Sequence, residues 1–174
     1  VLTDFFQNGI YDRNRHLFPT ISPSMDILVS SNLERFLFEI SDHNEAAISH
    51  WMKDLQEKGG FKLERILKDK MKEIVFAGYA SEKETMDTIK KVYRQYQYLI
   101  DPHTAVGVKV FNDYKVLAQD NNKTVVDATA SPFKFNQSVL TALSGENNVR
   151  NKDEIVLLQE LSKFSGLSIP ANLQ

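Results

Sequence analysis

A threonine hydroxyl among small residues is the group in this sequence best placed to meet a ligand. It is Thr129, which has an alanine on either side within the stretch TVVDATASPFKF, residues 124–135. The β-branched residues that open this stretch favour a strand, and Ser131 before Pro132 is typical of a helix start. We expect Val125–Ala128 to be buried and Thr129 to lie at the carboxyl end of the strand, where α/β sheets bind ligands. An ordinary strand-to-helix turn that binds nothing is the alternative.

A second helix start also carries small residues. Asp101 followed by Pro102 is typical of an N-cap and a first helical position, and Thr104 and Gly107 lie in the turns that follow. Backbone N–H groups at such a start can come close to a ligand. We therefore expect Asp101–Ala105 and Thr129 to lie near each other and to line one cleft.

Familiar catalytic motifs are absent from the sequence. It has seven glycines but no G-x-G-x-x-G run and no P-loop, and no G-x-S-x-G elbow occurs. The four histidines, His16, His43, His50 and His103, lack metal-ligand spacing and there is no cysteine, so we expect no metal site. If this chain does chemistry, part of the apparatus lies elsewhere.

Composition points to an ordinary globular chain. The 174 residues are enough for one domain; 42% are hydrophobic, 25% are charged and the formal net charge is -2. Lysine and arginine are spread without a basic block, which argues against nucleic acid as a partner. No apolar run approaches the roughly 20 residues that span a bilayer, and no signal peptide is recognisable. We expect a cytoplasmic protein with no membrane contact.

The elements that position these residues are expected to be mostly helices. Apolar residues at helical spacing predict helices over residues 31–41, 45–58, 81–100, 102–118, 132–144 and 154–164. Capping boxes are expected at Ser31–Glu34 and Ser81–Glu84, and Gly59-Gly60 is expected to stop a helix. Strands are expected at residues 73–80 and 124–126, and residues 25–30 are expected to be buried. Because no linker divides the chain into two domains, the sequence predicts one helix-dominated α/β unit with few strands over residues 1–174.

Three stretches together resemble one enzyme family. They are ISPSMDILVSSNLERFLFE (residues 21–39), IDPHTAVG (residues 100–107) and ATASPFKF (residues 128–135). In this order and spacing they resemble the threonine synthases, which belong to the tryptophan-synthase-β-like group, or fold type II, of pyridoxal-phosphate enzymes. The resemblance covers most of the chain and places it in the carboxyl-terminal part of the enzyme.

The resemblance implies a lyase reaction in which O-phospho-L-homoserine and water give L-threonine and phosphate. Pyridoxal 5'-phosphate serves as the electron sink in the full enzyme. The family's Schiff-base lysine and its glycine-rich phosphate loop lie near the amino-terminal end, and neither motif occurs in these residues. The resemblance thus implies that the chain has no catalytic lysine, needs the amino-terminal part of the same enzyme, and is inactive alone.

The resemblance also implies roles for individual residues. Thr129 matches the hydroxyl that faces the pyridine nitrogen of the cofactor. Ser30, Ser31 and Asn32 on one stretch, with His103 and Thr104 on another, are expected near the substrate. One departure is that Ser131 stands where many members have a histidine, so no imidazole role transfers to that position.

Two other readings compete with this one. The first is another fold type II enzyme, such as a serine/threonine dehydratase, and the second is a non-catalytic helical interaction domain. Periodicity does not separate them. An upstream lysine motif and glycine-asparagine loop would remove the second, and an assay with phosphohomoserine identifies the substrate.

Overall fold

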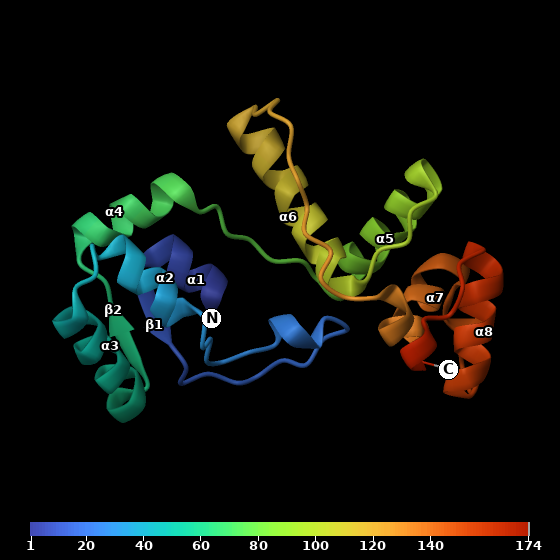
Figure 1. Ribbon diagram of the computed structural model, residues 1–174, viewed down its shortest axis with the longest axis horizontal. Helices are drawn as coiled ribbons and strands as arrows, with labels where there is room; N and C mark the ends of the chain where they lie inside the picture. The colour runs from blue at the N-terminus through green and yellow to red at the C-terminus, as the bar shows by residue number, and fades with distance from the viewer. Residues whose placement is uncertain (174) are drawn as a thin grey trace. The chain divides into compact units, whose positions relative to one another are not determined.

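The computed structural model describes residues 1–173 and forms two compact units (Figure 1). Unit 1 contains residues 1–19 and 23–78, and unit 2 contains residues 20–22 and the chain from Tyr79 onward. Helices dominate, and the part of the chain that is described contains only two strands. This confirms the predicted helix-dominated α/β class. The expectation that residues 1–174 act as a single unit stays a prediction.

Unit 1 packs four helices around a two-stranded antiparallel sheet. Its elements are α1 (Leu2–Asn8), β1 (Ile10–Asp12), the 3-10 turn η1 (Pro23–Met25), α2 (Leu33–Ile40), α3 (Glu45–Lys58), β2 (Gly60–Lys62) and α4 (Arg65–Ile74). Tyr11 of β1 is the register partner of Phe61 of β2. Their rings stack with centroids 5.3 Å apart, and Phe5 meets both edge-on. Such aromatic pairs bury large apolar areas, so this cluster is the centre of the unit 1 core.

The paired glycines between α3 and β2 explain how the helix ends and the sheet begins. Gly59 adopts the left-handed conformation (φ 81°) and ends α3, as the sequence predicts. Gly60 lies so close to β1 that an added Cβ would come within 2.3 Å of the Tyr11 carbonyl oxygen. Trp51 of α3 is buried beside Phe61 and belongs to the same core.

Within the described residues, every regular element of unit 2 is a helix. Its elements are α5 (Glu82–Tyr96), α6 (Pro102–Ala118), η2 (Pro132–Phe135), α7 (Asn136–Ser144), η3 (Glu146–Asn148), α8 (Glu154–Ser165) and η4 (Ala171–Leu173). Ile89 of α5, Ala105 of α6, Val139 of α7 and Leu161 of α8 have no exposed surface and form one core. The predicted caps at Ser81, Asp101 and Ser131 are all present with side-chain hydrogen bonds.

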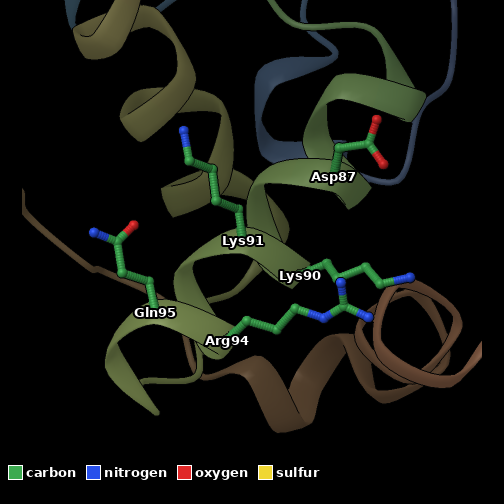
Figure 2. Close-up of a pocket in the computed structure, with 5 residues that line it drawn as sticks. All are labelled: Asp87, Lys90, Lys91, Arg94 and Gln95. Atoms are coloured by element: carbon green, nitrogen blue, oxygen red, sulfur yellow. The ribbon is translucent and has the colours of Figure 1, made fainter.

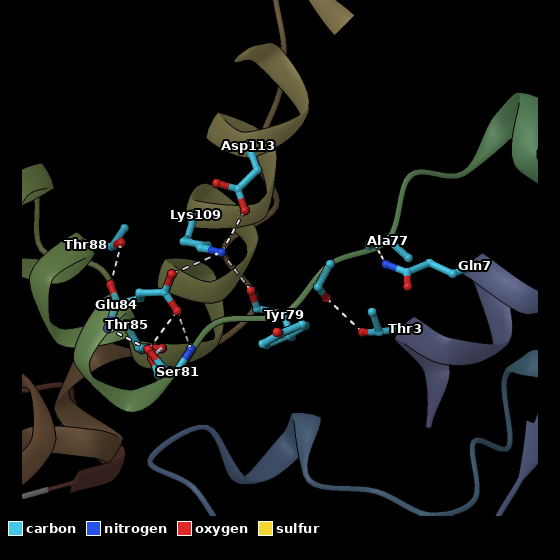
Figure 3. A network of polar contacts seen from close by, with 11 residues as sticks. Thr3, Gln7, Ala77, Tyr79, Ser81, Glu84, Thr85, Thr88, Lys109 and Asp113 are labelled. Atoms are coloured by element: carbon cyan, nitrogen blue, oxygen red, sulfur yellow. Dashed lines mark hydrogen bonds and ion pairs between the residues drawn. The ribbon is translucent and has the colours of Figure 1, made fainter. Parts of the chain in front are cut away.

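A lysine joins α5 and α6 (Figure 3). Lys109 Nζ of α6 lies 2.7 Å from Asp113 Oδ2 and 3.3 Å from Glu84 Oε1 of α5, and it donates to the Tyr79 carbonyl oxygen at 3.1 Å. The hydrogen bond to Asp113, assisted by Glu84, raises the pKa of Lys109. The ammonium group therefore stays charged at neutral pH and ties the two helices to the segment before α5.

Glu84 receives this lysine while it also closes the capping box of α5. The Ser81 backbone N–H donates to Glu84 Oε2 at 2.8 Å and the Ser81 hydroxyl donates to the same oxygen at 2.7 Å. These two bonds, followed by that from Lys109, lower the Glu84 pKa to about 2. The predicted Ser81–Glu84 capping box is confirmed.

Both predicted strands are wrong. Val125–Ala128 lies in an extended segment outside any strand and is exposed, Val125 to 89%. A strand needs a hydrogen-bonded neighbour, and within residues 1–173 none pairs with this segment. Residues 73–80 instead complete α4 and continue as extended chain. There the Ala77 and Gly78 carbonyls accept bonds from the side chains of Gln7 and Thr3 of α1.

Two further expectations in unit 1 fail. Residues 25–30 are partly exposed, with Met25 at 52%, because they form a 3-10 turn and a loop rather than a packed element. The Ser31–Glu34 capping box is absent, because the N-cap of α2 is Asn32, and it makes no side-chain cap bond. Asn32 already has helical backbone angles (φ -82°, ψ -17°), whereas a capping side chain usually requires an extended residue.

The Lys109→Met substitution is expected to raise the Glu84 pKa from about 2 toward its ordinary value. A lowered carboxyl pKa stabilises the fold above pH 4.5, the ordinary value, and that contribution is lost as the pH falls toward 2. The variant should therefore lose less stability than the wild type across this window. NMR titration of the Glu84 carboxyl carbon, with acid unfolding curves, measures both effects.

Lys115→Met is the matched control, because Lys115 is an exposed lysine on the same helix, remote from the Glu84 bonds. An unchanged Glu84 titration in Lys109→Met would show that the α5–α6 ion pair does not form in solution.

Candidate active site

The amino-terminal end of α6 is organised by one buried carboxylate. Asp101 is only 1% exposed. Its Oδ1 atom accepts the backbone N–H of His103 at 2.9 Å and that of Thr104 at 3.4 Å. The negative charge also lies at the positive end of the helix dipole. Asp101 is therefore a stabilised N-cap, as its position before Pro102 predicts.

The same carboxylate holds two side chains that the sequence marks as candidates. Nδ1 of His103 lies 2.9 Å from Asp101 Oδ1, and the Thr104 hydroxyl donates to Asp101 Oδ2. Because a carboxylate only accepts hydrogen bonds, the His103 Nδ1 atom carries the proton. The Phe135 ring packs edge-on against the imidazole at a centroid distance of 4.7 Å. His103 and Thr104 are thus fixed in orientation, and both are largely buried.

Thr104 opens onto a cleft of about 810 Å³ between α5 and α6. Its walls combine apolar side chains with charged and polar groups, a mixture typical of small-molecule sites. The lining residues include Tyr98, Ile100, Thr104, Val108 and Phe111, the charged Lys91, Lys109, Glu84 and Asp113, and Val126 and Ala128 from the extended segment. The cleft therefore joins one predicted helix start to the residue that precedes Thr129.

Thr129 is the next residue after Ala128, which lines this cleft. Ala128 lines the cleft, and Thr129 is exposed at the next position of an extended segment rather than at a strand end. Thr104 and Ala128 line the same cleft, but Thr129 is not among its lining residues, so the expectation that Asp101–Ala105 and Thr129 line one cleft stays a prediction. Contact between the Thr129 hydroxyl and a ligand stays a prediction.

The candidates Ser30, Ser31 and Asn32 lie in unit 1, where the buried Tyr11 bonds to the backbone of Ser30. The Tyr11 hydroxyl donates to the Leu28 carbonyl oxygen at 3.1 Å and accepts the Ser30 N–H at 3.0 Å. Burial raises the pKa of Tyr11, so this hydroxyl stays protonated. Ser31 and Asn32 are exposed at the start of α2. Their side chains are therefore available to a ligand, although their roles stay predictions.

A smaller groove of about 370 Å³ lies along α5 (Figure 2). It is lined by Asp87, Lys90, Lys91, Arg94 and Gln95, all from this one helix. Asp87 pairs with Lys83 at 2.7 Å one turn away. Long charged side chains on one helix are the usual solvated face, so we assign the candidate site to the larger cleft.

Sequence reasoning missed the groups that orient the candidates. Asp101 was expected only as a helix cap, yet the Asp-Pro-His-Thr order places an imidazole and a hydroxyl within its reach. The spacing of Glu84 and Lys109 gives no comparable signal, because their contact depends on how α5 packs against α6. The described residues contain no cluster of three or more potential metal ligands and no helix with the length and hydropathy to cross a membrane.

Comparison with known proteins places these features in one family. A family model described as "Threonine synthase, C-terminal" matches residues 104–168, which include most of α6 and the whole of α7 and α8. The threonine synthase of Saccharomyces cerevisiae is 34% identical over 183 aligned residues, which cover 96% of this chain and 35% of that enzyme. The chain therefore spans about a third of the length of this relative.

Two solved structures share the fold. The threonine synthase from yeast matches with a TM-score of 0.75 and 32% identity, covering 97% of this chain and 36% of that one. The PLP-bound threonine synthase from Brucella melitensis matches with a TM-score of 0.70 and 30% identity. This match covers 95% of this chain and 38% of that one. The chain belongs to the threonine synthase family and corresponds to the carboxyl-terminal part of its members.

Proposed function

We propose that the enzyme to which this chain belongs converts O-phospho-L-homoserine and water to L-threonine and phosphate with pyridoxal 5'-phosphate. The observation that carries the proposal is the shared cleft. Thr104, which the Asp101 carboxylate fixes in place, and Ala128, next to Thr129, come from two of the three stretches that resemble the family, and both line it. The alignment with the threonine synthase of Saccharomyces cerevisiae, which covers 96% of this chain, supports the same reaction.

The residues around Thr129 fit a pyridine ring. Thr129 lies between two alanines and is exposed, so a flat ring can approach its hydroxyl without meeting a bulky side chain. A neutral hydroxyl can bond the ring nitrogen without forcing it to hold a proton, unlike a carboxylate. When bound, pyridoxal phosphate supplies the electron sink for proton removal next to the amino group. Thr129 would orient the ring through that one hydrogen bond.

The Asp101 cluster contributes rigidity and polarity at the cleft wall. The Thr104 hydroxyl donates its hydrogen bond to Asp101, so the lone pairs on its oxygen can accept a hydrogen bond from a substrate ammonium or hydroxyl. The carboxylate holds the imidazole of His103 beside it. Groups fixed before the substrate arrives need no reorganisation during the reaction, which favours catalysis.

The lysine that joins the cofactor covalently is proposed to lie in the amino-terminal part of the enzyme. Such a lysine must lose its proton to act as a nucleophile. Lys109 lines the cleft, but its pKa is raised by Asp113, so it stays protonated. Lys134 is exposed within η2. Neither lysine has the environment that this role requires.

The full-length enzyme is expected to release phosphate and form threonine from O-phospho-L-homoserine in equal amounts. Coupled phosphate detection and amino-acid analysis measure the two products. Serine and threonine are the comparison substrates, because a dehydratase would convert them to 2-oxo acids. Conversion of these amino acids without turnover of phosphohomoserine would replace the proposed reaction with the dehydratase reaction.

Replacing the Thr129 hydroxyl by a methyl group in Thr129→Val is expected to weaken cofactor binding about 2- to 10-fold, the effect of one neutral hydrogen bond. The measurement is the cofactor dissociation constant of the full-length enzyme, followed by absorbance. Thr129→Ser keeps the hydroxyl and is expected to stay close to wild type. Equal affinity in all three proteins would remove Thr129 from the cofactor site.

The isolated chain is expected to form no specific lysine adduct with pyridoxal phosphate and to leave phosphohomoserine unchanged. Incubation with the cofactor, borohydride reduction and peptide mass spectrometry locate any labelled lysine. Weak labelling scattered over several lysines agrees with the proposal. Stoichiometric labelling of one lysine would contradict it.

A further inference from the structure

Thr129 lies between two anchored points of the chain, and the nearer one follows it. Within residues 1–173, the residues from Val125 to Ala130 make no hydrogen bond. On the amino-terminal side the next bonded residue is Thr124, five positions away, whose hydroxyl donates to the Asn122 carbonyl oxygen at 3.4 Å. On the other side it is Ser131, only two positions away. The turn at Ser131 is therefore the closer constraint on the Thr129 backbone.

The 3-10 helix η2 begins directly after Ser131 and is firmly held in unit 2. The Ser131 hydroxyl accepts the Phe133 N–H at 3.3 Å, and its carbonyl oxygen accepts the Lys134 N–H at 3.1 Å. Phe133 is 3% exposed and belongs to the unit 2 core. Its carbonyl oxygen accepts the buried Asn136 side chain at 3.2 Å. These contacts fix residues 131–136 as one turn.

His103 packs against this turn from α6. The ring of Phe135, the last residue of η2, meets the imidazole edge-on, with centroids 4.7 Å apart and an interplanar angle of 72°. The imidazole is itself held, because its Nδ1 atom lies 2.9 Å from Oδ1 of the buried Asp101. The cleft between α5 and α6 is lined by the neighbouring Thr104 but not by His103, which is 7% exposed. His103 thus joins the Asp101 carboxylate to η2.

We propose that His103 is a positioning residue for Thr129 and acts through Phe135 and η2. This inference rests on the proposed function, which assigns the Thr129 hydroxyl to the pyridine nitrogen of the cofactor. Edge-to-face aromatic contacts prefer a restricted geometry, so the imidazole limits where η2 can lie. A hydrogen bond weakens steeply with poor distance or angle, so a displaced turn at Ser131 would weaken the bond that Thr129 makes.

Cofactor binding by the full-length enzyme, followed by absorbance, tests this role. Phe135→Leu removes the ring and is expected to weaken cofactor binding at least about twofold, and at most as much as Thr129→Val, because one hydrogen bond is affected. His103→Asn keeps an N–H that can donate to Asp101 but lacks the ring, and it is expected to show a similar loss. Phe135→Tyr keeps the ring and is expected to bind the cofactor like the wild type.

Double variants separate a positioning role from a general loss of stability. Adding Phe135→Leu to Thr129→Val is expected to change the cofactor Kd less than about twofold, because no hydroxyl is left to position. His103→Asn combined with Phe135→Leu is expected to lose no more affinity than either variant alone, because both break the same contact. Additive losses in either combination would overturn the proposal.

Phe164→Leu is the matched control. Phe164 of α8 makes a ring contact with Tyr93 of α5, with centroids 5.4 Å apart, in the same unit. Its removal is expected to lower the thermal midpoint, as Phe135→Leu does, but to leave the cofactor Kd unchanged. An equal loss of affinity in this control would show that destabilisation alone accounts for the effect, and would overturn the proposal.

Amide hydrogen exchange of the cofactor-free full-length enzyme gives a readout that needs no bound cofactor. The Phe133 and Lys134 amides, which donate to Ser131, are expected to exchange faster in His103→Asn and Phe135→Leu than in the wild type or in Phe164→Leu. Unchanged exchange in both ring variants would overturn the proposal. If Phe135→Leu does not fold, His103→Asn carries the same comparisons.

Thr129→Val distinguishes failure of this inference from failure of the proposed function. Weaker cofactor binding in Thr129→Val, with normal binding in His103→Asn and Phe135→Leu, would overturn the role of His103 and leave the proposed function intact. Normal binding in Thr129→Val would refute the cofactor contact assigned in the proposed function, and with it the role of His103.

Discussion

The burial of the Asp101 carboxylate is the constraint on which the candidate site depends. A buried charge is costly unless hydrogen bonds and nearby opposite partial charges compensate it. Here two backbone N–H groups, an imidazole and a hydroxyl all donate to one carboxylate at the positive end of α6. Removing one partner would leave a buried polar group unsatisfied, at about 1–3 kcal/mol and more for a charged group. The electrostatics of the helix start therefore dictate where His103 and Thr104 are held.

The cleft beside this cluster depends on a different kind of interaction. Its width is set by how α5 lies against α6, and Lys109 bonds to groups on both helices and on the segment before them. Ile89 and Ala105 complete the same contact from the apolar side. The polar bonds at the rim and the apolar packing below thus both fix the position of α5 relative to α6. This restriction leaves the apolar wall of the cleft open to a ligand.

Local rules predicted three helix caps that depend on residues close in sequence, although the Ser31–Glu34 capping box is absent. The caps at Ser81, Asp101 and Ser131 involve bonds to residues two or three positions away, and the structure confirms all three. The strand expectations failed at residues 73–80 and 124–126, because strand formation depends on a partner that local composition does not specify. The Lys109–Glu84 ion pair could not be predicted from local sequence either, since its members are 25 positions apart. Sequence thus located Thr104 and its helix start, whereas the shape of the cleft required the packed helices.

Thr129 shows how these two levels of information combine in one residue. Its chemical suitability is local, because a hydroxyl between two alanines admits a flat ring wherever the segment lies. Its position is not local, because the segment that carries it is exposed and makes no backbone ladder within residues 1–173. The Asp101 cluster, by contrast, is complete within unit 2 and needs no outside group to fix its geometry. The candidate site therefore combines one wall that hydrogen bonds already hold rigid with one hydroxyl on an exposed segment.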